Sequence, residues 1–410
     1  MNWTAGRGTP CPTEPSFKSD PVPASSDFFG QRSAQAVLKH GVLMRYARYF
    51  AGRAGSATQG RVAFIDGYAG EGRYQDGSPG SPLLLASQAT RAQMFGRDVK
   101  LAFVERDEDR RHRLRESLAE AEIEPDQLLG GDLDEVVDGL LDRYTRRAVL
   151  LFADPFGLAV DRSTLERVLR RRSPSQPIDV LYHFSLSTVA RMGRAGVVAG
   201  STSRQNAEQL DAALGAIGWR EDFERATAPN APTEAALAVA RRFGESVRRA
   251  TRLQSTGVPV RQQPGQLPKY LLMLFSADQK AHWDFADQAS KAYVNWLYHC
   301  DREDYDANVR LREERGLTEL FPTPEPDMKD IDDQLRRDAA AYLPDHLADV
   351  LRDHGSLRPV DAVELVYGEM MGRVRVTHIR SAIKQLHDKG FIDDDGTREF
   401  WNHTIRWIAP

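Results

Sequence analysis

The sequence predicts an α/β fold built on a mostly parallel, Rossmann-like sheet with helices on both faces. Short apolar segments, each suited to one buried strand, alternate with amphipathic helical segments between roughly residues 60 and 185. Such alternation is typical of parallel sheets, because each crossover between parallel strands needs a helix. A glycine-rich stretch follows the first of these strands, where open α/β sheets bind their ligands.

The strands and helices are expected in a regular order. A helix within residues 27–50 leads into the first strand, RVAFID. The later strands of this series are expected in VKLAFVE, DQLLGGD, AVLLFADPFG and PIDVLYHFSLS. The helices between the strands are expected in SPLLLASQATRAQM, RDEDRRHRLRESLAEA, LDEVVDGLLDRY and RSTLERVLRRR. Pro82 fits this order, because proline is tolerated in the first turn of a helix.

Length and composition predict how the chain is divided into domains. Its length of 410 residues exceeds one ordinary core, so two or three domains are expected. Residues 1–26 are rich in Pro, Ser, Thr and Gly and are expected to form a disordered tail. The expected units after the tail are a Rossmann domain (27–200), a helical insertion (201–265), a returning strand and helix of the Rossmann domain (266–300), a linker (301–340) and a C-terminal domain (341–410).

The C-terminal segment is expected to be a winged helix-turn-helix domain. Three short helical segments precede a segment that should form a hairpin around an Asp-Gly turn. The third helix would be the recognition helix, and it offers three cations for contact with nucleic acid: Arg380, Lys384 and Lys389. Winged helices also mediate protein contacts, so a protein partner is the alternative reading of this domain.

Charge and cysteine content narrow the class of protein. The net charge of −4 means that any nucleic-acid binding must come from local basic faces. The two cysteines, Cys11 and Cys300, lie far apart in the sequence and favour a reducing, cytoplasmic setting over a disulfide scaffold. A membrane span and a secretory signal are not expected, because no apolar run has the length or flanks that either needs.

The stretch IDGYAGEGRY is the first candidate binding site. Its order, Gly-x-x-Gly-x-Gly, lets backbone lie against a nucleotide-like ligand, since glycine has no Cβ. A dinucleotide fingerprint fails here because Gln75 stands where its last glycine belongs. Asp66, at the end of the strand, is better suited to a cation or amine than to a phosphate; the aminocarboxypropyl group of S-adenosylmethionine is an example. A purely structural turn is the alternative.

Acidic residues also end the next two strands. Glu105 ends LAFVE, a position where a carboxylate typically binds ribose hydroxyls, although it could instead join a surface charge cluster. Asp132 ends the third strand, where it could face an adenine amino group, act as the N-cap of the following helix, or do both.

The fourth strand ends in Asp154, Pro155 and Phe156, a pattern that suits chemistry on an amine. An exocyclic amine is a poor nucleophile because its lone pair is delocalised into the ring. A carboxylate and a backbone carbonyl that accept its N–H groups stabilise the charge that develops on nitrogen. The aromatic ring of Phe156 could stack on a flipped-out base. A simple Asp-Pro turn is the alternative.

Taken together, the motifs resemble two known families. AVLKHGVL, DGYAGEGRY, GSPLLL, VER and LLFADPFG occur in the same order as in the RlmJ-type 23S ribosomal RNA adenine-N6 methyltransferases. The three-Cys-motif partner protein (TcmP) family is more similar still, because it shares the GSPGSP and DPFG forms. Its members look like methyltransferases and are encoded beside a protein with a three-cysteine motif. The resemblance covers roughly residues 35 to 190.

The resemblance implies a class I S-adenosylmethionine methyltransferase-like fold with S-adenosylmethionine as cofactor. It places Lys39 and His40 at the mouth of the site and the loop from Asp66 to Tyr74 at the methionine moiety. It also places Asp154 at the amine. Together with the strand-end positions, it gives these expected cofactor-binding residues: Lys39, His40, Asp66, Gly67, Tyr68, Ala69, Gly70, Gly72, Tyr74, Ser81, Glu105 and Asp132. The sequence departs from the RNA enzymes at one point, since Phe156-Gly157 replaces their Pro-Tyr pair. The resemblance therefore fixes neither the geometry with which an amine would be held nor adenine as the target base.

Two functions follow from these patterns. The first is a methyltransferase that acts on an amino group, on RNA or DNA. The second is a non-catalytic binding module that serves a dedicated three-cysteine-motif protein. A metal-dependent nuclease is the weakest reading, because no spacing of His or carboxylate residues specifies a metal site.

Overall fold

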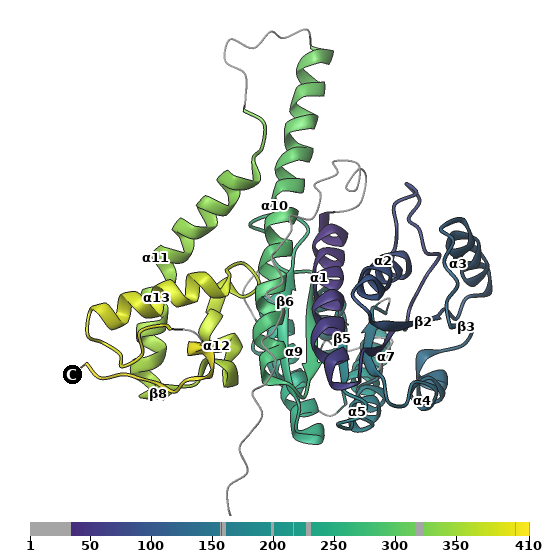
Figure 1. Ribbon diagram of the computed structural model, residues 1–410. Coiled ribbons are helices and arrows are strands. Elements are labelled where there is room, and N and C mark those ends of the chain that lie inside the picture. The colour runs from purple at the N-terminus through teal and green to yellow at the C-terminus, as the bar shows by residue number, and fades with distance from the viewer. Residues whose placement is uncertain are drawn as a thin grey trace, which may run out of the picture.

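A computed structural model describes residues 34–155, 157, 161–197, 201–215, 217–226, 231–315, 324–397 and 399–409. The expected disordered tail and Phe156 therefore lie outside the described residues. A central sheet carries helices on both faces, and a smaller, mostly helical C-terminal part packs beside it (Figure 1).

Within the described residues, one seven-stranded sheet has the order β3-β2-β1-β4-β5-β7-β6. Its strands are β1 (Arg61–Asp66), β2 (Asp98–Val104), β3 (Gln127–Leu129), β4 (Ala148–Ala153), β5 (Ile178–Phe184), β6 (Gln254–Val260) and β7 (Tyr270–Ser276). The first five strands pair in parallel, and β7 runs antiparallel to both of its neighbours. A doubly wound sheet with one antiparallel strand inserted near its edge is the class I methyltransferase-like arrangement, so the expected fold class is confirmed.

Ten helices of the described chain surround or extend this sheet. They are α1 (Ala34–Ala57), α2 (Ser81–Met94), α3 (Glu108–Glu120), α4 (Leu133–Arg143), α5 (Arg162–Arg170), α6 (Leu186–Gly196), α7 (Ser201–Leu214), α8 (Trp219–Glu224), α9 (Ala231–Thr251) and α10 (Gln279–Glu314). Among the described helices, none combines the length and the apolar character needed to cross a membrane.

Alternation along β1 shows how the sheet builds two cores. Val62 and Phe64 pack with residues of α1, α2 and α10. Ala63 and Ile65 face the other way and pack with residues of α4, α5, α6 and α9. Because successive strand side chains point to opposite faces, a strand buried on both sides must be apolar throughout. The apolar runs that predicted the strands reflect this double burial.

The elements depart from the expected segment bounds in two places. Strand β6 lies within the stretch expected to be a helical insertion; its Pro259 is tolerated because β6 is the edge strand of the sheet. The expected linker is helical at both ends, since α10 runs to Glu314 and the next helix begins at Met328. Ion pairs four residues apart, such as Arg302–Asp306 and Lys329–Asp333, support these polar helical segments.

The C-terminal part contains α11 (Met328–His354), β8 (Ser356–Leu357), α12 (Val363–Tyr367), α13 (Val376–Asp388) and β9 (Ile405–Arg406). Three helices and a folded-back end match the expected elements, while the winged-helix assignment itself stays a prediction. The prediction of a hairpin around an Asp-Gly turn is wrong. The chain does fold back, with an antiparallel bridge between Ile392 and Trp407, but the intervening loop includes a 3₁₀ turn at Phe400–Asn402.

Apolar packing joins the C-terminal part to the sheet domain. Trp283, on α10, is buried, and its ring lies 5.4 Å from that of Tyr367 and 5.8 Å from that of Phe400, measured between ring centroids. These aromatic contacts belong to the same continuous core that covers one face of the sheet. The two parts therefore share a core rather than hang on a free linker.

Candidate functional site

The candidate site lies where the parallel strands end. Asp66 is the last residue of β1, and Asp154 follows β4 directly. Because β1 and β4 are adjacent and parallel, both carboxylates emerge at the same edge of the sheet. Lys39, on α1, reaches the same point from one face. The site predicted from strand ends is thus assembled by neighbouring elements of the fold.

Asp66 is a fully buried carboxylate with spare hydrogen-bonding capacity. Its Oδ1 accepts a hydrogen bond from the Tyr68 backbone N–H at 3.1 Å. Its Oδ2 is buried and has no hydrogen-bond partner among the described residues. Burial raises the pKa of Asp66 to about 7, although the Ser81 hydroxyl and the Tyr68 N–H oppose the rise. A cation brought to this oxygen would restore the ionised form.

The loop after β1 is held by backbone contacts to neighbouring strands. The N–H of Gly67 donates to the Phe152 carbonyl, and that of Ala69 donates to the Val104 carbonyl. A Cβ at Gly70 would meet nothing within 4 Å, so the backbone there faces open space. Gly70 also has a φ of +62°, which disfavours other residues. This open backbone is where a ligand could approach closely.

Gly72, in contrast, is a packing glycine. A Cβ there would lie 2.9 Å from Leu114, and its φ is +81°. The N–H of Gly80 donates to the Gly72 carbonyl at 2.7 Å, which returns the chain to the start of α2. Close packing and a positive φ therefore account for Gly72, whereas at Gly70 only the positive φ requires a glycine.

Glu105 braces the glycine loop. Its carboxylate accepts the Gly70 N–H at 2.8 Å and the Asp107 N–H at 3.0 Å, and the residue is 8% exposed. The alternative for Glu105 was a place in a surface charge cluster. That alternative is excluded because the Glu105 side chain is buried. Glu105 fixes the loop, and its contact with a ribose stays a prediction.

Asp132 stands at the N-cap position of α4, but its side chain makes no capping hydrogen bond. The expected N-cap position of Asp132 is therefore confirmed, although its side chain does not cap the helix. Its carboxylate instead pairs with Arg106 at 3.1 Å, in a half-exposed position beyond β3. Arg106 follows Glu105 directly, so the ends of β2 and β3 are linked across the site edge by this ion pair.

Asp154 is the centre of a charged cluster. Its Oδ2 lies 2.5 Å from Lys39 Nζ, and its Oδ1 lies 3.1 Å from Nδ1 of His183. Burial would raise the pKa of Asp154, but the Lys39 ammonium and His183 outweigh it and hold that pKa below its usual value. Burial likewise disfavours the Lys39 ammonium, yet Asp154 and its surroundings raise the Lys39 pKa well above its ordinary value. Both groups are therefore ionised near neutral pH.

His183 and Tyr270 complete this cluster from β5 and β7. Their rings meet edge to face with centroids 4.1 Å apart, and the Tyr270 hydroxyl donates to the Gln35 carbonyl at 3.2 Å. Burial lowers the pKa of His183, while Asp154 opposes the change, so His183 is neutral at pH 7. A neutral imidazole beside a carboxylate is equipped to accept a proton.

His40 contributes from α1 through a different neighbour. It is buried, and its Nε2 lies 3.3 Å from the Tyr74 hydroxyl, at the far end of the glycine loop. The Tyr74 side chain is 40% exposed. Helix α1 thus touches both the loop after β1, through His40, and the end of β4, through Lys39.

Comparison with known proteins adds two distant structural likenesses. No protein-family model matches the sequence, and no curated protein matches it. The plantazolicin methyltransferase BamL, in complex with a triazolic desmethylPZN analogue and SAH, is 8% identical with a TM-score of 0.30, covering 60% of this chain and 86% of that chain. The plantazolicin methyltransferase BpumL, in complex with SAH, is 12% identical with a TM-score of 0.26, covering 62% and 89%. Both TM-scores are low, so the fold class rests on the strand order of the sheet alone.

Several predicted residues lie elsewhere or were missed. Phe156 lies outside the described residues, and Pro155 is buried directly after Asp154. The residues predicted for the site include neither His183 nor Tyr270. The sequence could have indicated both residues by position, because His183 lies near the end of β5 and Tyr270 begins the antiparallel β7. Asp66, Asp132 and Asp154 form no metal-ligand group within the described chain.

The three cations proposed for nucleic acid lie on or beside α13. Arg380 and Lys384 are exposed one helical turn apart, and Lys389 is the exposed C-cap residue. The Arg380 guanidinium lies 5.6 Å from the centroid of the Phe400 ring. The structure leaves all three on the surface, and their contact with nucleic acid stays a prediction.

Proposed function

We propose that this chain is an S-adenosylmethionine-dependent methyltransferase that acts on an amino group of a nucleic-acid base. The observation that carries the proposal is the placement of Asp154. An ionised, mostly buried carboxylate stands at the carboxyl end of β4, beside a glycine loop whose own carboxylate lacks a partner on one oxygen. Both groups lie at the carboxyl ends of the strands in a sheet of class I methyltransferase-like order, and open α/β sheets in general bind ligands at that edge.

The residues of the first loop fit the proposed cofactor. Asp66 Oδ2 is buried without a hydrogen-bond partner among the described residues, so a cationic amino group there would satisfy it. Gly70 leaves its backbone open for close approach. Glu105 and the Tyr68 N–H brace the same loop. Ser81 is the first residue of α2, and Asp132 stands at the N-cap position of α4. When bound, S-adenosylmethionine would supply an electrophilic methyl group attached to a sulfonium.

Asp154 is suited to hold the amine. As an ionised carboxylate it would accept an N–H of the substrate and stabilise the positive charge that develops on nitrogen. Lys39 holds the same oxygen, so the amine must share or displace that ammonium. The neutral His183 imidazole lies beside Asp154 and would accept the proton that nitrogen loses.

The nucleic-acid part of the proposal rests on other features. A planar base amine is the kind of weak nucleophile that a strand-end carboxylate assists. The exposed Arg380, Lys384 and Lys389 would provide backbone contacts from the C-terminal part. The resemblance to ribosomal RNA adenine-N6 methyltransferases points to the same class of substrate.

A second candidate is a non-catalytic module that serves a three-cysteine-motif protein. The ion pair between Lys39 and Asp154 favours it, because a carboxylate already neutralised by a lysine is less available to an amine. The Asp-Pro-Phe-Gly form of the motif favours it as well. In this reading the sheet edge holds a nucleotide-like ligand or none, and the partner protein supplies the activity.

Transfer of a labelled methyl group tests the choice between the two. The intact chain would be incubated with methyl-labelled S-adenosylmethionine and total RNA, or with genomic DNA. We expect label in one pool, reduced at least about a hundredfold by Asp154→Asn. Asp353→Asn, an exposed carboxylate on α11, is the matched control and should keep full activity. Label in neither pool, or equal label with Asp154→Asn, would remove the catalytic proposal.

A further inference from the structure

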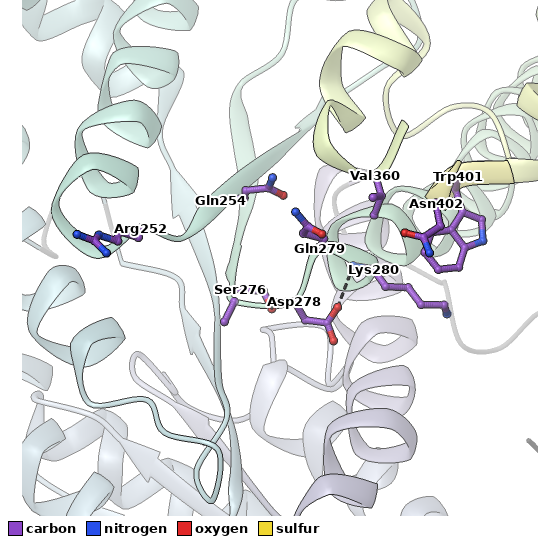
Figure 2. A pocket seen from close by; sticks show the side chains of 10 residues that line it. Arg252, Gln254, Ser276, Asp278, Gln279, Lys280, Val360, Trp401 and Asn402 are labelled. Atoms are coloured by element: carbon purple, nitrogen blue, oxygen red, sulfur yellow. Dashed lines mark hydrogen bonds between the residues drawn. The ribbon is translucent and has the colours of Figure 1, made fainter. Parts of the chain in front are cut away.

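A cavity of about 620 Å³ lies at the other end of the sheet. Strand β6 runs parallel to β5, because both are antiparallel to β7, so the start of β6 lies at the amino ends of the strands. The cavity opens there, between Gln254 of β6 and Trp401 of the C-terminal part, with Arg252 at one end and Lys280 near the other (Figure 2). It is therefore separate from the site around Asp154.

Two arginine runs of the sequence meet at one end of this cavity. The run at 170–172 ends α5 and the run at 248–252 ends α9. The Arg170 guanidinium donates to the Ala250 carbonyl, and the Arg172 guanidinium donates to the Thr251 carbonyl. These hydrogen bonds place the two runs side by side at the last turn of α9, next to the cavity-lining Arg252.

Helix capping explains only some of the arginines in these two runs. Arg170 and Arg172 satisfy free carbonyls at the end of α9, a structural role. Arg248, Arg249 and Arg252 are exposed and make no ion pair with any described residue. Three cations that follow one another at the end of one helix, without an ion-pair partner among the described residues, favour an anion beside them.

Carboxylates near the cavity are already neutralised. Asp278 pairs with Arg53. Asp284 pairs with Lys280 at 2.8 Å. Asp361, which accepts a hydrogen bond from Gln279, pairs with Arg358 at 3.3 Å. The positive charge of the α9 arginines is therefore not cancelled by these acids.

The opposite end of the cavity offers an aromatic face. Trp401 is half-buried, and Lys280 Nζ lies 5.7 Å from the centroid of its ring. Asn402, the next residue, is exposed and lines the cavity, as does the Gln254 amide (Figure 2). An arginine at one end, an aromatic ring at the other and the amide side chains of Gln254 and Asn402 are the groups that proteins use on phosphates and bases.

We propose that this groove binds a single-stranded stretch of nucleic acid. The α9 arginines would contact its phosphates, and Trp401 would stack on a base. A polar groove shared by two parts of the chain suits an extended strand better than a compact apolar ligand, which prefers an enclosed apolar pocket. The binding requires neither the cofactor nor methyl transfer, so it stands apart from the proposed activity.

Fluorescence anisotropy of the full-length chain tests this proposal. The probes are labelled oligo(U) and oligo(dT) of about 15 nucleotides, with a duplex of equal length beside them. We expect Arg249→Gln/Arg252→Gln to weaken single-strand binding about tenfold and to reduce the salt slope by about 1.4, since each phosphate contact on a single strand adds about 0.7. Trp401→Leu should weaken it about tenfold as well.

Matched variants separate the outcomes. Arg115→Gln, an exposed arginine on α3, should bind as the unchanged chain does. Binding is measured without S-adenosylmethionine, so its loss is read separately from a loss of methyl transfer. Thermal melts of Trp401→Leu identify a variant that fails to fold; Asn402→Ala then takes its place. Three results would overturn the proposal: no single-strand binding, binding unaffected by both groove variants, or equal affinity for duplex with no effect of Trp401→Leu, which indicates general polyanion attraction.

Discussion

Lys39 Nζ lies 2.5 Å from Asp154 Oδ2, so an ion pair joins helix α1 to the carboxyl end of strand β4. Both side chains are mostly buried, where an ion pair is screened little by solvent. The pair sets the charge of the candidate amine-binding group, and it makes α1 part of the site rather than a mere cover of the sheet.

Removing the lysine should change how Asp154 titrates. Burial already favours the neutral form of Asp154, and the Lys39 ammonium is the largest opposing influence. Lys39→Met should therefore raise the pKa of Asp154 above its usual value, whereas Lys39→Arg should leave it low. Carbon-13 NMR of the carboxyl groups across a pH titration measures this directly. An unchanged Asp154 titration in Lys39→Met would show that the pair does not control its charge.

Asp66 should lower the stability of the folded chain at alkaline pH. Its folded pKa of about 7 exceeds the ordinary value of 3.8, so the native state holds the proton more tightly. Stability is therefore lost as pH rises from 3.8 to 7, by at most about 4 kcal/mol at 1.36 kcal/mol per pKa unit.

The substitution Asp66→Asn removes this cost. The gain in unfolding free energy should be larger at about pH 8 than at about pH 5, because the carboxyl is mostly protonated at the lower pH. Urea unfolding at both pH values provides the test. Asp353→Asn, exposed on α11, is the matched control for the loss of one carboxylate. A gain that is equal at both pH values would contradict a raised pKa.

The two inner glycines of the loop should respond differently to alanine. Gly70→Ala adds a methyl group to open space at positive φ, so it should cost about 1 kcal/mol of stability and weaken ligand binding. Gly72→Ala would also force its Cβ against Leu114 at 2.9 Å, which adds about 1–3 kcal/mol. Chemical denaturation of both variants ranks the two costs. The opposite ranking would show that the loop packs differently.

The shared core predicts that the sheet domain and the C-terminal part unfold together. Trp283 contacts Tyr367 and Phe400 across the boundary and is fully buried. Trp283→Ala should cost about 3–5 kcal/mol and should lower the melting of both parts. Calorimetry of the intact chain should give one transition. Two transitions, only one of them shifted by Trp283→Ala, would show that the parts fold independently.

Much of the fold and part of the site were predictable from the sequence. The apolar runs that predicted β1 and β4 are buried on both faces, which leaves a strong signal in the sequence. Strand β6 was missed because Gly257 and Pro259 interrupt its pattern, which only an edge position allows. The polar extension of α10 was missed because ion pairs on its surface, rather than an apolar face, support it.

The site was predictable where chain order sets the geometry. Asp66 ends β1, while Glu105 and Asp154 directly follow β2 and β4, so strand order alone brings them to one edge. The contact of Lys39 with Asp154 crosses 115 positions, and that of His183 with Tyr270 joins two antiparallel strands. Such contacts depend on tertiary packing, which local sequence patterns do not encode. The buried, half-partnered state of Asp66 likewise emerges only when the sheet is assembled.

Calorimetric titration of S-adenosylhomocysteine into the purified chain, with Asp66→Asn alongside, tests the central claim most directly. S-adenosylhomocysteine carries the same amino group as the proposed cofactor and cannot react. We predict saturable binding to the unchanged chain at pH 7.5, weakened at least about tenfold in Asp66→Asn. An unchanged chain that binds neither S-adenosylhomocysteine nor S-adenosylmethionine would contradict the account.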